Sequence, residues 1–235
     1  MVQRSSDHRP RVFGHGSSTP GDELNSRASF ERVLGLPIDG VELDVRRTAD
    51  DALVVHHDAA LPDGRALHEL SRHDLPAHML LLADVLDICA GVVVNIEIKN
   101  FSIDQAFDPA ERVTDLVLAL LRERGGGDRV LVSSFGMGCV DHVRRHAPHI
   151  DTAVLLYYPG HPEALLDDVV VHGHRIVHPF APNVDEAFMA AARARDLEVN
   201  VWTGRDDAAT LQRLVALDVD GIITGRPELL VTVQR

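Results

Sequence analysis

Gly40-Val41-Glu42-Leu43-Asp44-Val45 is the stretch of sequence that decides the fold. Side chains alternate across a β-strand, so Glu42 and Asp44 project from one face and the aliphatic residues project from the other. Inside a barrel, both carboxylates would be buried together, which is costly unless a cation compensates them. Pairing with Arg46 and Arg47 is the alternative interpretation of the two acids.

A second strand, Val94-Asn95-Ile96-Glu97-Ile98-Lys99, repeats this pattern with Glu97 and Lys99 on one face. Barrel enzymes build their active sites at the carboxyl ends of the strands, where structural ion pairs have no reason to gather. Glu42, Asp44 and Glu97 together predict a site for a hard divalent cation, Mg²⁺ or Ca²⁺, rather than zinc, because no Cys/His ligand spacing is present.

Lys99 is the only lysine, and the other 22 of the 23 basic residues are arginine. A compact ammonium group beside a cation site is suited to binding phosphate or a leaving oxygen. A simple salt bridge to Glu97 is the alternative.

Strand-like and helix-like segments alternate along the whole chain, which predicts a parallel α/β fold. The helical periodicity is clearest at Pro109–Arg124, Val184–Asp196 and Asp206–Leu217. Because no G-x-G-x-x-G follows the first strand and the strand count suits closure, we expect a (β/α)8 TIM barrel over residues 11–235, preceded by a frayed arm at 1–10. The eight expected strands are Arg11–His15, Gly40–Arg46, Val92–Lys99, Arg129–Phe135, Thr152–Tyr157, Arg175–Pro179, Glu198–Thr203 and Gly221–Thr224, with a shorter extended segment at Leu53–His57.

Composition excludes several classes of function. The net charge of −13 argues against nucleic acid as a partner, because phosphate backbones attract basic surfaces. No apolar run reaches the roughly 18–20 residues of a membrane span, so we expect no stable membrane insertion. The polar start, with no secretory signal, and two cysteines in helix-like segments, Cys89 and Cys139, favour the cytoplasm. The oligomeric state stays open.

Two of the 14 histidines stand out because they end strands. His15 closes the first strand, and His57 follows the apolar run Leu53-Val54-Val55. Histidine transfers protons readily near neutral pH, so the pair could serve as general base and general acid. Asp58 could orient one ring or join the metal ligands.

The chain resembles the glycerophosphodiester phosphodiesterase family, whose motifs are H-R-G, P-E-N-T, E-L-D, H-D and E-x-K. Residues 40–58 follow the pattern from E-L-D to H-D without a gap, and Ile96-Glu97-Ile98-Lys99 matches E-x-K. Ser134-Phe135, Val201-Trp202-Thr203 and 220–224 resemble later landmarks. The resemblance implies a barrel of the PLC-like phosphodiesterase type that acts on a small-molecule phosphodiester.

By this resemblance, Glu42, Asp44 and Glu97 would bind the metal, and Lys99 would contact the phosphate. His15 and His57 would be the two acid–base histidines. Trp202, the only tryptophan, would form an apolar wall against the alcohol group, with ordinary barrel packing as the alternative.

The N-terminal motifs depart from the family pattern. Pairing His15-Gly16-Ser17 with H-R-G keeps the spacing to Glu23-Leu24-Asn25-Ser26 but replaces the arginine by Gly16. Pairing Gly14-His15-Gly16 instead would remove the catalytic histidine, and we prefer the ungapped pairing. Leu24 and Gly225 stand where the family has or often has an acid, and the short stretch 59–82 predicts a small lid.

The leading hypothesis is a metal-dependent phosphodiesterase that releases glycerol 3-phosphate and an alcohol from a glycerophosphodiester. One alternative is a related lyase or phosphodiesterase with another phosphodiester substrate. The other is a non-catalytic barrel that binds metal or phosphate.

Overall fold

The computed structural model describes residues 9–15, 25–126, 129–157, 162–204 and 207–233. Within these ranges, eight parallel strands form a closed barrel in the order β1-β9-β8-β7-β6-β5-β4-β2, and β2 pairs with β1 to complete the ring. The barrel strands are β1 (Arg11–His15), β2 (Gly40–Arg47), β4 (Val93–Ile98), β5 (Val130–Ser134), β6 (Asp151–Leu156), β7 (Ile176–Pro179), β8 (Glu198–Trp202) and β9 (Gly221–Thr224). The predicted TIM barrel is confirmed.

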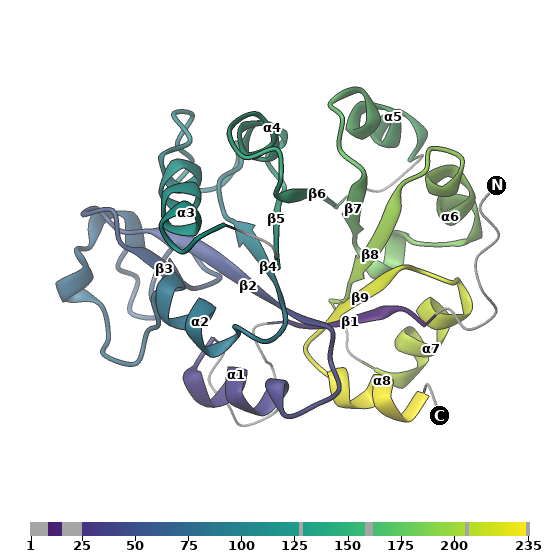
Figure 1. The fold of residues 1–235 in the computed structure, drawn as a ribbon, viewed down its shortest axis with the longest axis horizontal. Helices are drawn as coiled ribbons and strands as arrows, with labels where there is room; N and C mark the ends of the chain where they lie inside the picture. The colour runs from purple at the N-terminus through teal and green to yellow at the C-terminus, as the bar shows by residue number, and fades with distance from the viewer. Residues whose placement is uncertain (1–8, 16–24, 127–128, 158–161, 205–206, 234–235) are drawn as a thin grey trace.

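A helix follows each barrel strand and covers the outside of the ring (Figure 1). The helices are α1 (Arg27–Leu34), α2 (Leu82–Ile88), α3 (Arg112–Glu123), α4 (Met137–His146), α5 (Glu163–Val171), α6 (Glu186–Arg193), α7 (Ala208–Ala216) and α8 (Pro227–Val233). The last strand, β9, lies beside β1, so the two ends of the sequence meet to close the barrel. None of the helices in the described ranges has the length and apolar character to cross a membrane.

The extended segment after β2 is β3 (Leu53–Val55), which pairs with β2 in the antiparallel direction. The segment between β3 and α2 contains two short 3-10 helices, η1 (Leu67–Glu69) and η2 (Arg72–Asp74), and a third, η3 (Ala181–Asn183), follows β7. Val54, Leu61 and Leu67 form a small apolar cluster of their own beside the barrel. This segment therefore packs as a compact extension next to His57.

Two of the predicted helices begin later than the periodicity suggests because a capping side chain fixes the first turn. Asp185 accepts a hydrogen bond from the backbone N–H of Phe188, and Asp207 accepts one from Thr210. Such capping defines the residue before the helix. Consequently α6 begins at Glu186 and α7 at Ala208.

The alternation read from residues 40–45 separates the core from the site. Val41, Leu43 and Val45 are buried in the apolar cluster that lies between the strands and helices such as α2 and α3. Glu42 pairs in register with Asn95, and Asp44 pairs with Glu97. Neighbouring strands thus bring the predicted carboxylates side by side inside the barrel.

Gly40 starts β2 at a close approach between strands. A Cβ atom there would lie 2.6 Å from the ring of Phe13 and 2.7 Å from the carbonyl oxygen of Val93. We expect Gly40→Ala to lower the free energy of unfolding by about 1–3 kcal/mol, because overpacking moves the neighbouring strands. Urea denaturation measures this change.

Gly91→Ala is the matched control, since nothing lies within 4 Å of a Cβ at Gly91. Its unfolding free energy should stay within about 0.5 kcal/mol of the wild type. Equal unfolding midpoints for the two variants would contradict the tight contact at Gly40.

Candidate active site

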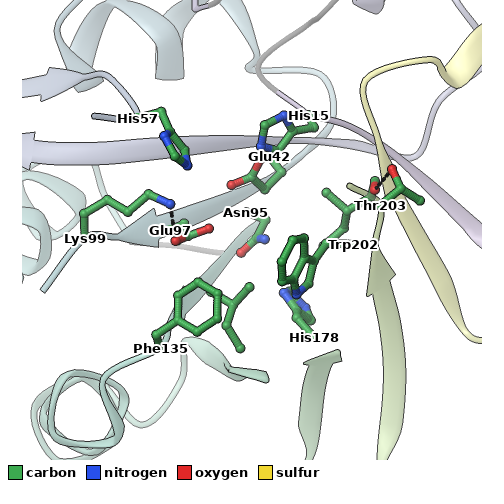
Figure 2. A pocket seen from close by; sticks show the side chains of 12 residues that line it. His15, Glu42, His57, Asn95, Glu97, Lys99, Phe135, His178, Trp202 and Thr203 are labelled. Carbon is green, nitrogen blue, oxygen red and sulfur yellow. Dashed lines mark hydrogen bonds and ion pairs between the residues drawn. The ribbon is translucent and has the colours of Figure 1, made fainter. Parts of the chain in front are cut away.

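A cavity of about 220 Å³ opens at the carboxyl ends of the barrel strands (Figure 2). Six of the seven residues predicted to form the site line it, and Asp44 lies next to it. The lining residues are His15, Glu42, His57, Asn95, Glu97, Lys99, Phe135, Leu155, His178, Trp202, Thr203 and Ile223. Closure of the barrel thus gathers residues that are up to 208 positions apart, from His15 to Ile223.

Lys99 forms ion pairs with two of the predicted acids. Its Nζ lies 2.8 Å from Oδ1 of Asp44 and also contacts Oε1 of Glu97. The salt bridge to Glu97 that the sequence offered as an alternative is therefore present, and Asp44 shares the same ammonium group. All three side chains are buried.

The three acids differ in how readily they ionise. Burial and the neighbouring Asp44 and Glu97 raise the pKa of Glu42 well above its usual range. Burial also raises the pKa of Glu97, although Lys99 opposes this effect. Burial acts in the same direction on Asp44, but Lys99 and the nearby histidines outweigh it and lower its pKa. Glu42 is thus the acid that most lacks a compensating charge.

Arg46 and Arg47 do not neutralise the acids of β2. Arg46 makes a bidentate pair with Asp104, with N···O distances of 3.0 and 2.9 Å, and Arg47 pairs with Asp51. The Nε of Arg46 donates a 2.8 Å hydrogen bond to the carbonyl oxygen of His57. The alternative interpretation of Glu42 and Asp44 as partners of these arginines is therefore wrong.

The two candidate acid–base histidines stand at the upper part of the cavity, His57 above Lys99 and His15 beside Glu42 (Figure 2). Nδ1 of His57 lies 2.8 Å from Oδ1 of Asp58, so Asp58 orients this ring. The side chain of His57 is 57% exposed, which leaves it open to solvent and substrate.

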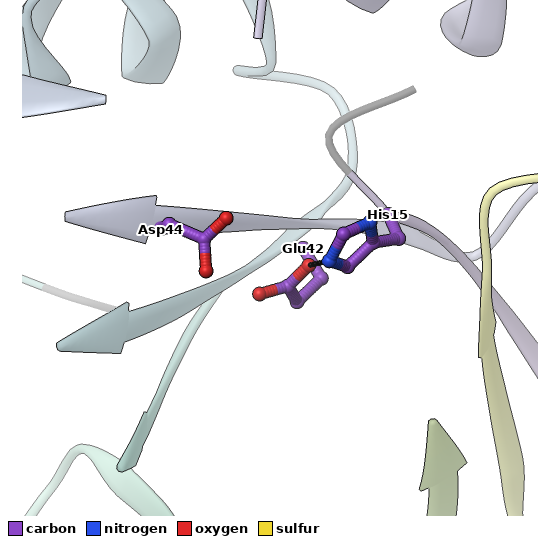
Figure 3. Close-up of side chains that lie close together, drawn as sticks. All are labelled: His15, Glu42 and Asp44. Carbon is purple, nitrogen blue, oxygen red and sulfur yellow. Dashed lines mark ion pairs between the residues drawn. The ribbon is translucent and has the colours of Figure 1, made fainter. Parts of the chain in front are cut away.

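His15, Glu42 and Asp44 form a cluster that could hold a metal ion (Figure 3). One ligand atom from each lies within 4.8 Å of the other two, and Nε2 of His15 is 3.3 Å from Oε2 of Glu42. Neither carboxylate oxygen of Glu42 takes part in a hydrogen bond with the described part of the chain. A buried, uncompensated carboxylate beside a second one fits a divalent cation that prefers oxygen ligands.

Trp202 belongs both to the lining of the cavity and to the packing of the barrel. It lines the cavity, and its ring also packs against other aromatic rings at the barrel mouth. The centroid distances are 4.3 Å to Phe180 and 6.1 Å to both Phe135 and Tyr157. One wall of the cavity is therefore aromatic, while the opposite wall carries the charges.

Sequence reasoning missed Asn95 and His178, which are buried and line the cavity. Asn95 shares a strand face with Glu97, so the alternation that selected Glu97 could also have selected Asn95. His178 offered no such signal, because nothing in the sequence distinguishes it from the other histidines. Gly16, Ser17, Glu23 and Leu24, which carry the departures from the family motifs, lie outside the described residues.

Comparison with known proteins identifies similar chains over nearly the full length. The Glycerophosphoryl diester phosphodiesterase family matches residues 14–229. A glycerophosphodiester phosphodiesterase of Caldanaerobacter subterraneus subsp. tengcongensis is 27% identical and aligns over 95% of this chain and 97% of its own.

Solved structures share the fold. A glycerophosphodiester phosphodiesterase of Thermotoga maritima superposes with a TM-score of 0.79 at 22% identity, covering 96% of this chain and 99% of the other. A phosphodiesterase of Oleispira antarctica, solved in complex with the product sn-glycerol-3-phosphate, gives a TM-score of 0.84 at 18% identity, covering 95% and 96%.

The raised pKa of Glu42 leads to a test of the cation site. A carboxyl whose pKa is raised on folding stabilises the protein below its unfolded value of 4.5, and this stabilisation is lost as pH rises toward the folded value. Without divalent cation at neutral pH, Glu42→Gln should therefore raise the melting temperature. It should also remove the increase in melting temperature that Mg²⁺ or Ca²⁺ causes in the wild type.

Thermal melts in chelator and in excess divalent cation measure both effects. Glu69→Gln is the control, because this side chain is 73% exposed and outside the cavity. A Glu42→Gln protein that is stabilised by the cations as strongly as the wild type would contradict a site at Glu42.

Proposed function

Because this chain belongs to the glycerophosphoryl diester phosphodiesterase family, we propose that it hydrolyses glycerophosphodiesters to glycerol 3-phosphate and an alcohol. Membership makes it a phosphoric diester hydrolase. The observation that supports the proposal best is a single cavity lined by His15, His57, Lys99 and buried carboxylates. The proposed reaction needs only a small-molecule partner, in keeping with the acidic net charge, and we propose the cytoplasm as its location.

The charges of the cavity support a requirement for a divalent metal. Three buried acids face one buried lysine, so the ionised group would carry a net negative charge that repels a phosphodiester anion. A cation held by Glu42, Asp44 and Glu97 reverses this balance, and carboxylate ligands suit Mg²⁺ or Ca²⁺. When bound, such a cation supplies charge neutralisation and orientation for the phosphate.

His15 and His57 are the proposed acid and base. In the reaction, a hydroxyl of the glycerol or a water molecule forms a new bond to phosphorus, and the bond from phosphorus to the alcohol oxygen breaks. Attack by the glycerol hydroxyl gives a cyclic phosphate, and a water molecule then opens this ring to glycerol 3-phosphate. One histidine accepts the proton of the attacking hydroxyl, and the other donates a proton to the departing oxygen. The contact between His57 and Asp58 keeps one ring oriented for this transfer.

Lys99 and Trp202 are proposed to bind the substrate. The ammonium group of Lys99 is held by two carboxylates at the edge of the cavity, where it can offer its remaining N–H to a phosphate oxygen. The ring of Trp202 faces the cavity from the opposite wall and can cover an apolar part of the substrate.

A substrate panel tests the reaction. With Mg²⁺ or Ca²⁺, the purified protein should release glycerol 3-phosphate from glycerophosphocholine or a similar diester, measured by a coupled glycerol 3-phosphate assay. The panel includes sphingomyelin and lysophospholipids. Turnover of only those lipids would favour the alternative substrate class, and no turnover by folded protein would reject the proposed reaction.

Substitution of the two histidines tests their function as acid and base. His15→Ala and His57→Ala should each lower kcat by about 10²–10⁴-fold, which is the contribution typical of a general acid or base. His73→Ala, at an exposed position in η2, should leave kcat unchanged. Residual turnover that neither cavity variant reduces would instead favour a barrel without acid–base catalysis.

A further inference from the structure

The floor of the cavity carries polar groups that the proposed reaction does not use. Asn95 and His178 are each only 1% exposed, yet both line the cavity (Figure 2). Both amide atoms of Asn95, Nδ1 of His178 and Nε1 of Trp202 are buried and have no hydrogen-bond partner in the described part of the chain. A buried polar group without a hydrogen-bond partner destabilises the protein.

Two other polar residues near the cavity do have hydrogen-bond partners. Asn200, on the neighbouring strand to His178, donates from Nδ2 to Oε1 of Glu198 at 2.8 Å. Ser134 donates to the carbonyl oxygen of Ile98, also at 2.8 Å. The unpaired groups of Asn95, His178 and Trp202 therefore share one feature, which is that they border the cavity.

The hydrogen-bond direction at His178 can be assigned. Nδ2 of Asn200, which already donates to Glu198, lies 3.3 Å from Nε2 of His178, so Nε2 accepts. Burial, together with the charge of Arg11, lowers the pKa of His178 to about 3, and the ring is neutral at neutral pH. A neutral ring that accepts at Nε2 carries its proton on Nδ1. The cavity thus offers N–H donors from His178, Trp202 and Asn95 and one acceptor, Oδ1 of Asn95.

These groups are all uncharged, whereas the charged Glu97 and Lys99 follow Asn95 toward the barrel mouth. Asn95 precedes Glu97 by two residues on β4 and so lies one step farther from the barrel mouth. Uncharged donors and an acceptor suit a hydroxyl group, which both donates and accepts, better than a phosphate anion. The cavity therefore offers charged and uncharged groups separately, which matches a molecule that carries both a phosphate and a hydroxyl.

We propose that Asn95, His178 and Trp202 bind the terminal hydroxyl of the glycerol group, the one farthest from phosphorus. The proposal rests on the proposed function and adds the orientation of the substrate. The glycerol group enters the barrel first, and the departing alcohol points to the mouth. These three residues then make the enzyme specific for glycerol among diol phosphodiesters.

A pair of substrates tests the proposal without any substitution. The first is a glycerophosphodiester, and the second is its propane-1,2-diol counterpart, which keeps the hydroxyl beside the phosphate ester but lacks the terminal one. The wild type should show about 10- to 100-fold lower kcat/KM for the second substrate, because binding it leaves buried polar groups unpaired. Equal kcat/KM for both substrates overturns the proposal.

Substitutions then test whether Asn95 and His178 cause this preference for the glycerol substrate. Asn95→Leu and His178→Leu should lower kcat/KM for the glycerol substrate much more than for the propanediol substrate. The ratio of the two kcat/KM values should therefore fall toward one. Ser133→Ala is the matched control, because its Oγ is also buried and has no partner among the described residues, but Ser133 does not line the cavity. It should keep the wild-type preference.

A merely structural role of the floor would lower kcat/KM for both substrates by the same factor, and this result also overturns the proposal. Melting curves show whether each variant is folded, and the wild-type comparison decides the question if a variant is not. Wild-type turnover of both diesters at equal rates rejects only the floor site. No turnover of either diester rejects the proposed function, and the floor site with it.

Discussion

The ion pairs of Lys99 with Asp44 and Glu97 are the interaction on which the rest of the site depends. They bring β2 and β4 together through charge as well as through backbone hydrogen bonds, in the register that pairs Asp44 with Glu97. One ammonium group cannot neutralise three buried carboxylates, so Glu42 is left without a full counter-charge. Ion pairs inside proteins usually recover little of their desolvation cost. This imbalance of charge supports the proposal that the site binds a further cation.

A second buried pair, Arg46 with Asp104, supports the histidine on the other side of the cavity. Both side chains are buried, and the geometry is bidentate. Since Arg46 also donates to the carbonyl oxygen of His57, it connects the end of β2 with the segments that follow β3 and β4. His57 follows a strand of only three residues, which by itself could not fix a side chain over the cavity. The pair therefore supplies the positional constraint that the short strand lacks.

Much of this arrangement could be predicted from the sequence because it follows from alternation along single strands. Glu42, Asp44, Glu97 and Lys99 project into the barrel for this reason, and the strand boundaries follow the same apolar pattern. The proximity of His15 to Glu42 is different, because it depends on the pairing of β1 with β2 that closes the ring. The same holds for His178, which lines one cavity with Asn95 and Trp202 although the three residues come from different strands. Contacts across a closed barrel join residues from strands that are distant in the sequence. No local sequence pattern predicts such contacts.

The charged residues and the aromatic residues of the cavity lie on different sides. Acids, lysine and histidines occupy one side of the upper cavity, whereas Trp202 with Phe180 and Tyr157 forms an aromatic wall on the other. Tyr157 is 67% exposed, so this wall continues outward to solvent. In the proposed orientation, a glycerol group bound at Asn95 and His178 leaves the departing alcohol next to the aromatic wall. Contacts there are apolar, and the space continues to solvent. Aromatic faces accept apolar groups and organic cations alike. In the proposed orientation, this division would make the glycerol end the strictly selected part of the substrate and would allow the alcohol to vary.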